Sequence, residues 1–192
     1  MSLQIRRFLA PLIGLLLGVF LSGWIGLLIT WGPTEIVDRL GTENAYIITF
    51  LFAALGGFSS LTAGPFYAAI GTFAAGGTNA VLLGTLAGIG ITIGDSIFFY
   101  LARCGLTRTR LDSNPFVAHI RSRLLRMPGW SLPLGTLGYT AFTPLPNDVL
   151  MVIFGLLKQR ALLILPFVLI GNVTHMTLLT TGAALLPGWL GF

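Results

Sequence analysis

The segment "TPLPNDVL", residues 143–150, places two prolines, an amide and a carboxylate inside an otherwise apolar stretch, 131–157. Proline removes a backbone donor and clashes with the preceding helical turn, so a helix breaks here. The break leaves arms of about a dozen residues, which at about 1.5 Å per residue are about 18 Å long. Because the hydrocarbon core of a bilayer is about 30 Å thick, neither arm is long enough to cross it alone.

The composition makes a bilayer the relevant comparison. Of the 192 residues, 55% are hydrophobic and 9% are charged, and the mean hydropathy is +0.89; a soluble domain carries about 25% charged residues. We therefore expect one all-α membrane domain, 1–192. Uninterrupted apolar segments predict three spanning helices, at 8–30, 79–101 and 161–186, with a short polar loop at 32–44 after the first. Two broken apolar segments remain, at 45–76 and 131–157.

The basic residues favour one topology. Loops rich in Lys and Arg stay in the cytoplasm, so Arg6 and Arg7 place the N-terminus there. If both broken segments crossed the bilayer, the six arginines within 103–126 would lie outside. If each enters and returns on one side, these arginines lie inside, as do Lys158 and Arg160. The second arrangement also gives the net charge of +5 a role that does not involve nucleic acid.

We therefore predict two oppositely oriented re-entrant helical hairpins. The first, 45–76, enters from outside with its tip near Pro65, and the second, 131–157, enters from inside with its tip at Pro144 and Pro146. Non-helical backbone at this depth survives only where protein or water satisfies its polar groups. The remaining alternative is a pair of unrelated proline kinks in ordinary helices.

An offset of 81 positions indicates that the two hairpin units form an inverted repeat. Each unit comprises a broken segment and the long helix after it. The aligned identities are Thr62 with Thr143, Pro65 with Pro146, Ala80 with Ala161 and Gly90 with Gly171. Inverted repeats whose broken helices meet near the membrane midplane are typical of secondary transporters.

The polar stretch between the units, 106–130, predicts an amphipathic helix. Pro115 suits a first helical turn. One face is apolar, with Phe116, Val117, Ile120, Leu124 and Met127, and another is polar, with His119, Ser122, Arg123 and Arg126. Such a helix lies at the cytoplasmic interface, where arginines meet anionic headgroups. It either recruits lipid headgroups or only anchors the fold.

Three stretches carry a family resemblance. "GDSIFFYLARCG", 94–105, resembles the Gly-Asp…Tyr…Arg…Gly signature of the DedA family, the prokaryotic branch of the VTT (SNARE-associated Golgi) superfamily. "TAGPFYAAIGTFAAGG", 62–77, and "AFTPLPNDVLMVIFGLL", 141–157, are similar to the family's two hairpins. The similarity covers roughly 52–182. It implies a multi-pass protein of a prokaryotic inner or plasma membrane that moves phospholipids or polyprenyl phosphate carriers between leaflets, in some members with the proton gradient.

The chain departs from the family pattern at both tips, which makes it a divergent branch. Where members carry a glutamate after the first hairpin's Pro-Gly, this chain has Phe66 and Tyr67. The arginines of the family's second hairpin are missing, and the acid Asp148 stands there instead. Whether the family's recognition of a lipid phosphate survives is left open.

The second tip supplies the leading candidates for substrate or ion binding. Asp148 is costly to bury near mid-bilayer, and such acids usually line a pathway. Asn147 beside it can orient a ligand. Alternatively, both residues only cap the second arm, because their place at a helix N-terminus favours an amide and a carboxylate.

Four more polar residues are candidates for an ion path. Asp95 lies about 10 Å deep in its helix and pairs with Arg103 or, because Arg103 is two turns away, with another helix. Asn172 and His175 share a face of the last helix, at i and i+3. His175 either joins a proton relay with an aspartate or hydrogen-bonds to a neighbouring helix.

These residues favour a transporter or scramblase that acts on membrane lipids and uses protons. We expect no metal and no cofactor, because the chain offers two histidines, one cysteine and scattered acids. A non-transporting membrane scaffold is the alternative, and self-association is left open. An intramembrane aspartyl protease fits less well, since Thr92 stands where a Gly-x-Gly-Asp motif needs glycine.

Overall fold

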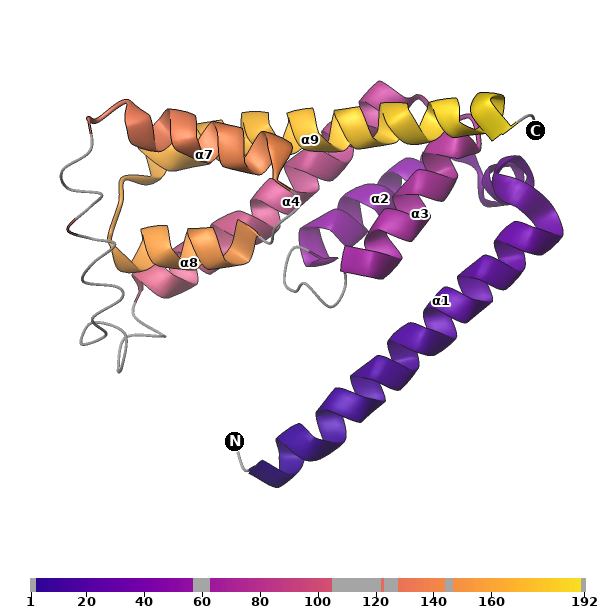
Figure 1. Cartoon of the computed structure of the whole chain (residues 1–192), viewed down its shortest axis with the longest axis horizontal. Helices are drawn as coiled ribbons and strands as arrows, with labels where there is room; N and C mark the ends of the chain where they lie inside the picture. Colours follow the sequence, from indigo (N-terminus) through magenta and orange to yellow (C-terminus); the bar gives the residue numbers. More distant parts are fainter. Residues whose placement is uncertain (1–2, 57–62, 105–121, 123–127, 144–146, 191–192) are drawn as a thin grey trace.

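The computed structural model describes residues 3–56, 63–104, 122, 128–143 and 147–190, with side chains described between residues 15 and 186 of these ranges. Pro144, Pro146 and most of the predicted amphipathic helix 106–130 lie outside them. The described residues form helices and no strand (Figure 1). The helices are α1 (Leu3–Leu40), α2 (Thr42–Gly56), α3 (Ala63–Ala75), α4 (Ala80–Arg103), α7 (Ser131–Phe142), α8 (Asn147–Leu156) and α9 (Ala161–Leu190).

Three of these helices are long and apolar enough to cross a membrane. The qualifying spans are Gly18–Leu40 in α1, Ala80–Arg103 in α4 and Ala161–Leu186 in α9. The other four helices have 10 to 15 residues, and at about 1.5 Å per residue none of them exceeds about 23 Å. The three uninterrupted apolar segments are thus long helices, and the two broken segments are pairs of short ones.

The polar loop predicted at 32–44 is wrong, because most of this stretch is helical. Gly32 adopts φ +74° and kinks α1, which then continues to Leu40. A side chain would be strained at such a φ, whereas Pro33 suits the first turn of the renewed helix. Arg39 pairs with Glu35 one turn earlier at 2.6 Å, and its guanidinium lies 4.3 Å from the Trp31 ring centroid. The polar composition of this stretch led to the incorrect prediction of a loop, because its polar side chains interact with one another along one face of a helix.

The six helices after α1 form two units that exchange arms. The first arm of each unit packs on its own long helix, α2 on α4 and α7 on α9. The second arm packs on the long helix of the other unit, α3 on α9 and α8 on α4 (Figure 1).

The two long helices run in opposite directions. The hydroxyl of Thr180 donates to the carbonyl of Ala80 at 2.7 Å. A Cβ added to Gly84 would lie 2.5 Å from Thr177 Cα, and one added to Gly88 would lie 2.5 Å from Val173 Cα. Because residue numbers rise along α4 as they fall along α9, the second unit is inverted relative to the first.

The offset of 81 also relates the turns that follow the second arms. Gly77 and Lys158 are 81 positions apart, and both have positive φ, +93° and +53°. Each N–H donates to the carbonyl three residues earlier, that of Ala74 at 3.4 Å and that of Gly155 at 3.0 Å. The next pair of bonds also matches, from Thr78 to Phe73 and from Gln159 to Phe154. This is a helix C-cap with a left-handed residue, built twice.

The apolar cores repeat with the same offset. One core contains Met151, Phe154, Ile164 and Val168. The residues 81 positions earlier are Ile70, Phe73, Leu83 and Ala87, and all four belong to the other core. Gly90 and Gly171 are another such pair. A Cβ at Gly90 would collide with Phe50 and Ala53 of α2, and one at Gly171 would collide with Thr140 of α7. These glycines let each first arm approach its own long helix closely.

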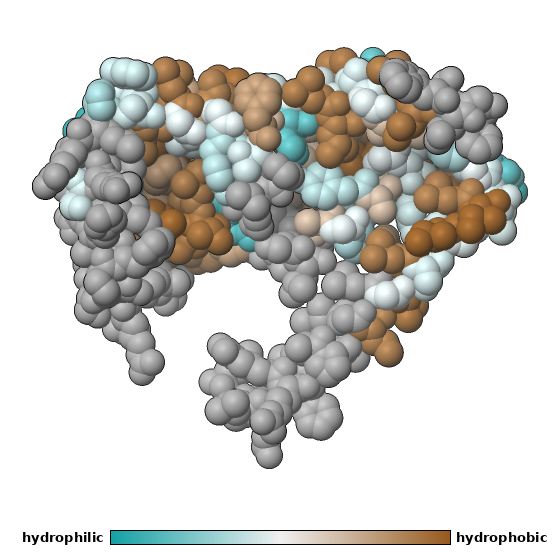
Figure 2. Space-filling view, viewed as in Figure 1, coloured by the Kyte–Doolittle hydropathy of each residue, from teal (hydrophilic) through white to brown (hydrophobic). Residues whose placement is uncertain are grey.

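Helix α1 contacts the other helices through its middle and through its C-terminal turns, where Ile36 and Val37 are buried. Trp24 Nε1 donates to Thr72 Oγ1 of α3 at 2.9 Å, and the Trp24 ring packs edge-on against Phe73. The N-terminal half of α1 lies apart from the other helices (Figure 1). In the second half of α1, Ile29 is 80% exposed. Apolar residues cover much of the described surface (Figure 2), as is typical of helices that contact lipid.

Replacing Gly88 with leucine is expected to destabilise the protein, because the new side chain must displace the α9 backbone at Val173. Overpacking of this kind costs about 1–3 kcal/mol or more. The measurement is the fraction of detergent-purified protein that stays monodisperse after graded heating. Gly18→Leu is the matched control, since a Cβ at Gly18 meets nothing within 4 Å. Equal loss in both variants would contradict the close α4–α9 packing.

Candidate functional site

Four polar side chains meet where α8 reaches both long helices. Asp95 and Thr92 come from α4, Asn172 from α9, and Asn147 is the first residue of α8. Asp95 is 1% exposed and Asn172 is 2% exposed, so both lie in the interior. We call these four residues the polar cluster. It lies between the two apolar cores, in helices that are otherwise strongly hydrophobic.

The amides of the polar cluster converge on one carboxylate oxygen. Asn172 Nδ2 donates to Asp95 Oδ2 at 2.9 Å and to Thr92 Oγ1 at 3.1 Å. Asn147 Nδ2 donates to Asn172 Oδ1 at 2.8 Å and reaches Asp95 Oδ2 at 3.5 Å. The hydroxyl of Thr92 in turn donates a hydrogen bond to the carbonyl oxygen of Gly88 at 2.8 Å. The network therefore ties the start of α8 to both long helices through Asp95.

One acceptor in the polar cluster has no partner. Asn147 Oδ1 is buried and makes no hydrogen bond. Buried polar atoms are nearly always satisfied, so an orphaned oxygen beside a carboxylate suggests a place for a further donor. A hydronium ion, a small cation or a protonated Asp95 would each supply the missing positive or hydrogen-bonding group.

Asp95 also lacks a counter-charge in the described part of the chain. The one ion pair found there joins Arg39 and Glu35, far along the chain from Asp95. Ionised carboxylates buried without a cation cost several kcal/mol, and inside membranes such residues mark ion or proton pathways. Neutral amides alone do not balance the charge. The site is therefore suited to binding and releasing a proton or a cation.

Asp148 lies beside the polar cluster and is less buried. It follows Asn147 in the first turn of α8, where a carboxylate suits the helix dipole. Its side chain is partly exposed. Its position is therefore compatible with both alternatives for Asp148, capping of α8 and a role in a pathway.

Arg103 and His175 do not join the polar cluster. Arg103 is exposed at the end of α4, and its Nη1 donates to the carbonyl of Gln159 in the turn between α8 and α9, at 2.5 Å. His175 Nδ1 lies 3.1 Å from the carbonyl of Ala141 at the end of α7. Each side chain thus joins neighbouring elements, which is the structural alternative that the sequence left open for His175.

Pro65 lies beside the first break and not in it. It is the third residue of α3 and is buried, in the first turn, where a proline lacks no needed hydrogen bond. Sequence reasoning identified Asp95, Asn147 and Asn172 but missed Thr92. The available signal was spacing, since Thr92 precedes Asp95 by three residues and shares its helix face.

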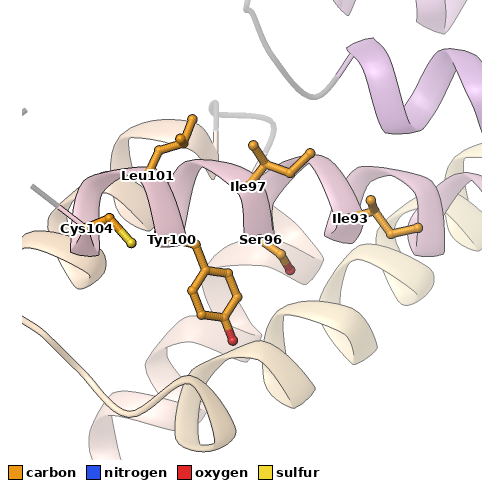
Figure 3. Close-up of a pocket in the computed structure, with 6 residues that line it drawn as sticks. All are labelled: Ile93, Ser96, Ile97, Tyr100, Leu101 and Cys104. Carbon is orange, nitrogen blue, oxygen red and sulfur yellow. The ribbon is translucent and has the colours of Figure 1, made fainter. Parts of the chain in front are cut away.

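A groove of about 490 Å³ runs along the face of α4 opposite to the one that carries Asp95. Its lining residues are Ile93, Ser96, Ile97, Tyr100, Leu101 and Cys104. Figure 3 shows these side chains along one side of the helix. The lining is almost wholly apolar, and its first polar group, Ser96, follows Asp95 directly in the chain. A groove with this lining accepts hydrocarbon.

No family model, no curated protein and no solved structure matches this chain.

Asn172→Leu is expected to lower stability by about 1–3 kcal/mol, because it leaves the buried Asp95 carboxylate without its main donor. In an Asp95→Asn background the same change is expected to cost less, since no carboxylate is left unpaired. The two changes should therefore be non-additive in a double-mutant cycle measured by thermal unfolding. Thr174→Val is the control on α9, because Thr174 bonds only to the Ile170 carbonyl of its own helix. Equal costs of Asn172→Leu in both backgrounds would disprove the coupling.

Proposed function

We propose that this protein is a DedA-type membrane transporter that moves a lipid between the leaflets of a bilayer and uses proton or cation exchange at Asp95. The observation that carries the proposal is the buried carboxylate, held by Asn172 and Asn147 at the junction of both long helices with a short arm. Charged groups at such depth are rare in membrane helices and mark pathways. The family resemblance of 52–182 gives the lipid class.

The proposed membrane arrangement makes α2–α3 and α7–α8 two re-entrant hairpins. Helices of these lengths do not cross a bilayer alone, and the two units run in opposite directions. In this arrangement the N-terminus, the basic stretch 106–130 and the α8–α9 turn face the cytoplasm of a prokaryotic cell. The arginines of these segments then follow the positive-inside rule.

The polar cluster suggests how charge and movement are coupled. When Asp95 is ionised, it accepts hydrogen bonds from Asn172 and Asn147, and this holds the start of α8 against α4 and α9. When Asp95 carries a proton, one of its oxygens becomes a donor, and the two amides no longer face a pure acceptor. The free energy that holds α8 in place therefore depends on the charge of Asp95. Such a dependence is what couples ion binding to a conformational change.

The groove along α4 supports a lipid as the transported molecule. It is open at the surface of a helix that is long enough to span a membrane, and its lining suits an acyl chain. Ser96 and Tyr100 add hydroxyl groups that can meet the polar end of a lipid. A lipid lying there would contact the face of α4 opposite to the polar cluster.

The lipid proposal predicts faster transbilayer movement of fluorescent phospholipids and polyprenyl phosphates in vesicles that contain the purified protein. Asp95→Asn and Asp148→Asn are each expected to slow this movement about tenfold, because the charge that couples to α8 is removed. Dithionite quenching of outer-leaflet fluorophores, with and without a proton gradient, gives the rate. Glu35→Gln is the control, since Glu35 is an exposed residue of α1. A wild-type rate equal to that of empty vesicles would exclude lipid transport, and a scaffold would then remain.

The proposed topology predicts the side from which the native thiol reacts. Cys104 is exposed at the end of α4 and should react with an impermeant maleimide from the cytoplasmic side only. In a Cys104→Ser background, Glu43→Cys at the start of α2 should react from the outer side. Labelling of Cys104 from outside intact cells would overturn the hairpin arrangement.

A further inference from the structure

The offset of 81 gives every residue of the polar cluster a counterpart in the other unit. The polar cluster and Asp148 occupy one set of positions, and the positions that the offset relates to them, on α3, α4 and α9, are filled differently. The counterparts are Phe66 for Asn147, Tyr67 for Asp148, Met176 for Asp95, Ile91 for Asn172 and Val173 for Thr92. Four of these five side chains are hydrocarbon or thioether, and none is an acid or an amide. The repeat therefore preserves the backbone at these positions, whereas the side chains change from polar to mostly apolar.

Three counterparts, Phe66, Ile91 and Met176, pack in the core, whereas Tyr67 is 37% exposed. Phe66 is 5% exposed and Met176 is 1% exposed, and both belong to the larger apolar core, against which Ile91 packs. The Phe66 ring meets the ring of Phe52 edge-on, with centroids 5.9 Å apart. Where the polar cluster buries a carboxyl group and two amides, the counterpart positions on α3, α4 and α9 bury apolar side chains in mutual contact.

Because of the inversion, the polar positions and their apolar counterparts face opposite ends of the α4–α9 pair. Because the units run in opposite directions, the starts of α8 and α3 approach the α4–α9 pair from opposite ends. Water and ions follow polar side chains into a membrane protein, whereas apolar constrictions exclude them. The start of α8 offers Asn147 and the partly exposed Asp148, and the start of α3 offers Phe66.

We propose that Phe66, Ile91 and Met176 form a hydrophobic barrier that closes the polar cluster from the side of the first hairpin. In this conformation Asp95 exchanges protons or cations only from the side of the second hairpin. The inference deepens the proposed transport function and rests on it for the membrane orientation, in which the open side is cytoplasmic. The barrier itself requires that the wild-type protein pass no protons beyond those coupled to lipid movement.

Proton flux through vesicles that contain the full-length protein tests the barrier. An internal pH-sensitive dye reports proton entry when a potassium gradient with valinomycin sets the membrane potential. Wild-type vesicles should pass protons no faster than they move lipid. The double variant Phe66→Asn, Met176→Asn should increase proton flux about tenfold or more, because polar groups then continue from Asp95 to the other side.

Two controls separate loss of the barrier from general damage. Phe73→Asn places the same amide in the same core on the same helix, but 81 positions before Phe154 and outside the counterpart set, and it should leave the vesicles tight. Adding Asp95→Asn to the double variant should abolish the leak, because the path runs through that carboxyl group. A leak that persists without Asp95, or that is equal in Phe73→Asn, would overturn the barrier.

Thiol accessibility tests the barrier without adding polar groups to the core. In a Cys104→Ser background, Asn147→Cys should react with a small impermeant thiol reagent from one side. Phe66→Cys should react at least about tenfold more slowly from either side, because an apolar barrier excludes water. Comparable rates would overturn the proposal.

The outcomes also separate this inference from the proposed function. If the protein moves no lipid, but leaks protons through Asp95 only in the double variant, the barrier is supported and the proposed lipid transport is excluded. If the wild-type protein moves lipid but passes protons faster than lipid, the barrier is excluded and the lipid transport is retained.

Discussion

The close antiparallel packing of α4 and α9 is the constraint on which the rest of the structure depends. At Gly84 and Gly88 there is no room for a side chain against the α9 backbone, and Thr180 bonds across the same interface to Ala80. This contact fixes the reversed direction of the two units. It also creates the two surfaces on which all four short arms pack. A change in the α4–α9 register would move every arm together.

The same contact explains how a carboxyl group is kept in an apolar interior. Asp95 faces α9 near the crossing, so Asn172 reaches it from the partner helix and Asn147 from the arm that packs on α4. The two donors come from two different helices, α9 and α8, and the acceptor from a third, α4. The amides donate hydrogen bonds to Asp95 but do not neutralise its charge. The folded protein therefore tolerates this carboxyl group in its interior, and the group remains suited to binding a proton or a cation.

Sequence alone predicted the elements and the offset better than it predicted the contacts. Apolar segment lengths indicated the three long helices, and the offset of 81 derived from four identities also relates the turns at Gly77 and Lys158. Asp95, Asn147 and Asn172 stood out individually as polar residues in apolar surroundings. That they bond to one another, while Arg103 and His175 bond elsewhere, depends on helix crossings that periodicity does not encode. The stretch 33–40 was misassigned because its charges pair along a helix.

The exchange of arms has a consequence for the origin of such a chain. Each long helix is covered by one arm of its own unit and one arm of the other. A half-length chain with two short arms and one long helix would expose the face that the missing arm covers, and its glycines would meet no partner helix. It would become complete only by pairing with a second copy inserted in the opposite direction. The fold is thus equivalent to an antiparallel homodimer of half-sized proteins joined into one polypeptide.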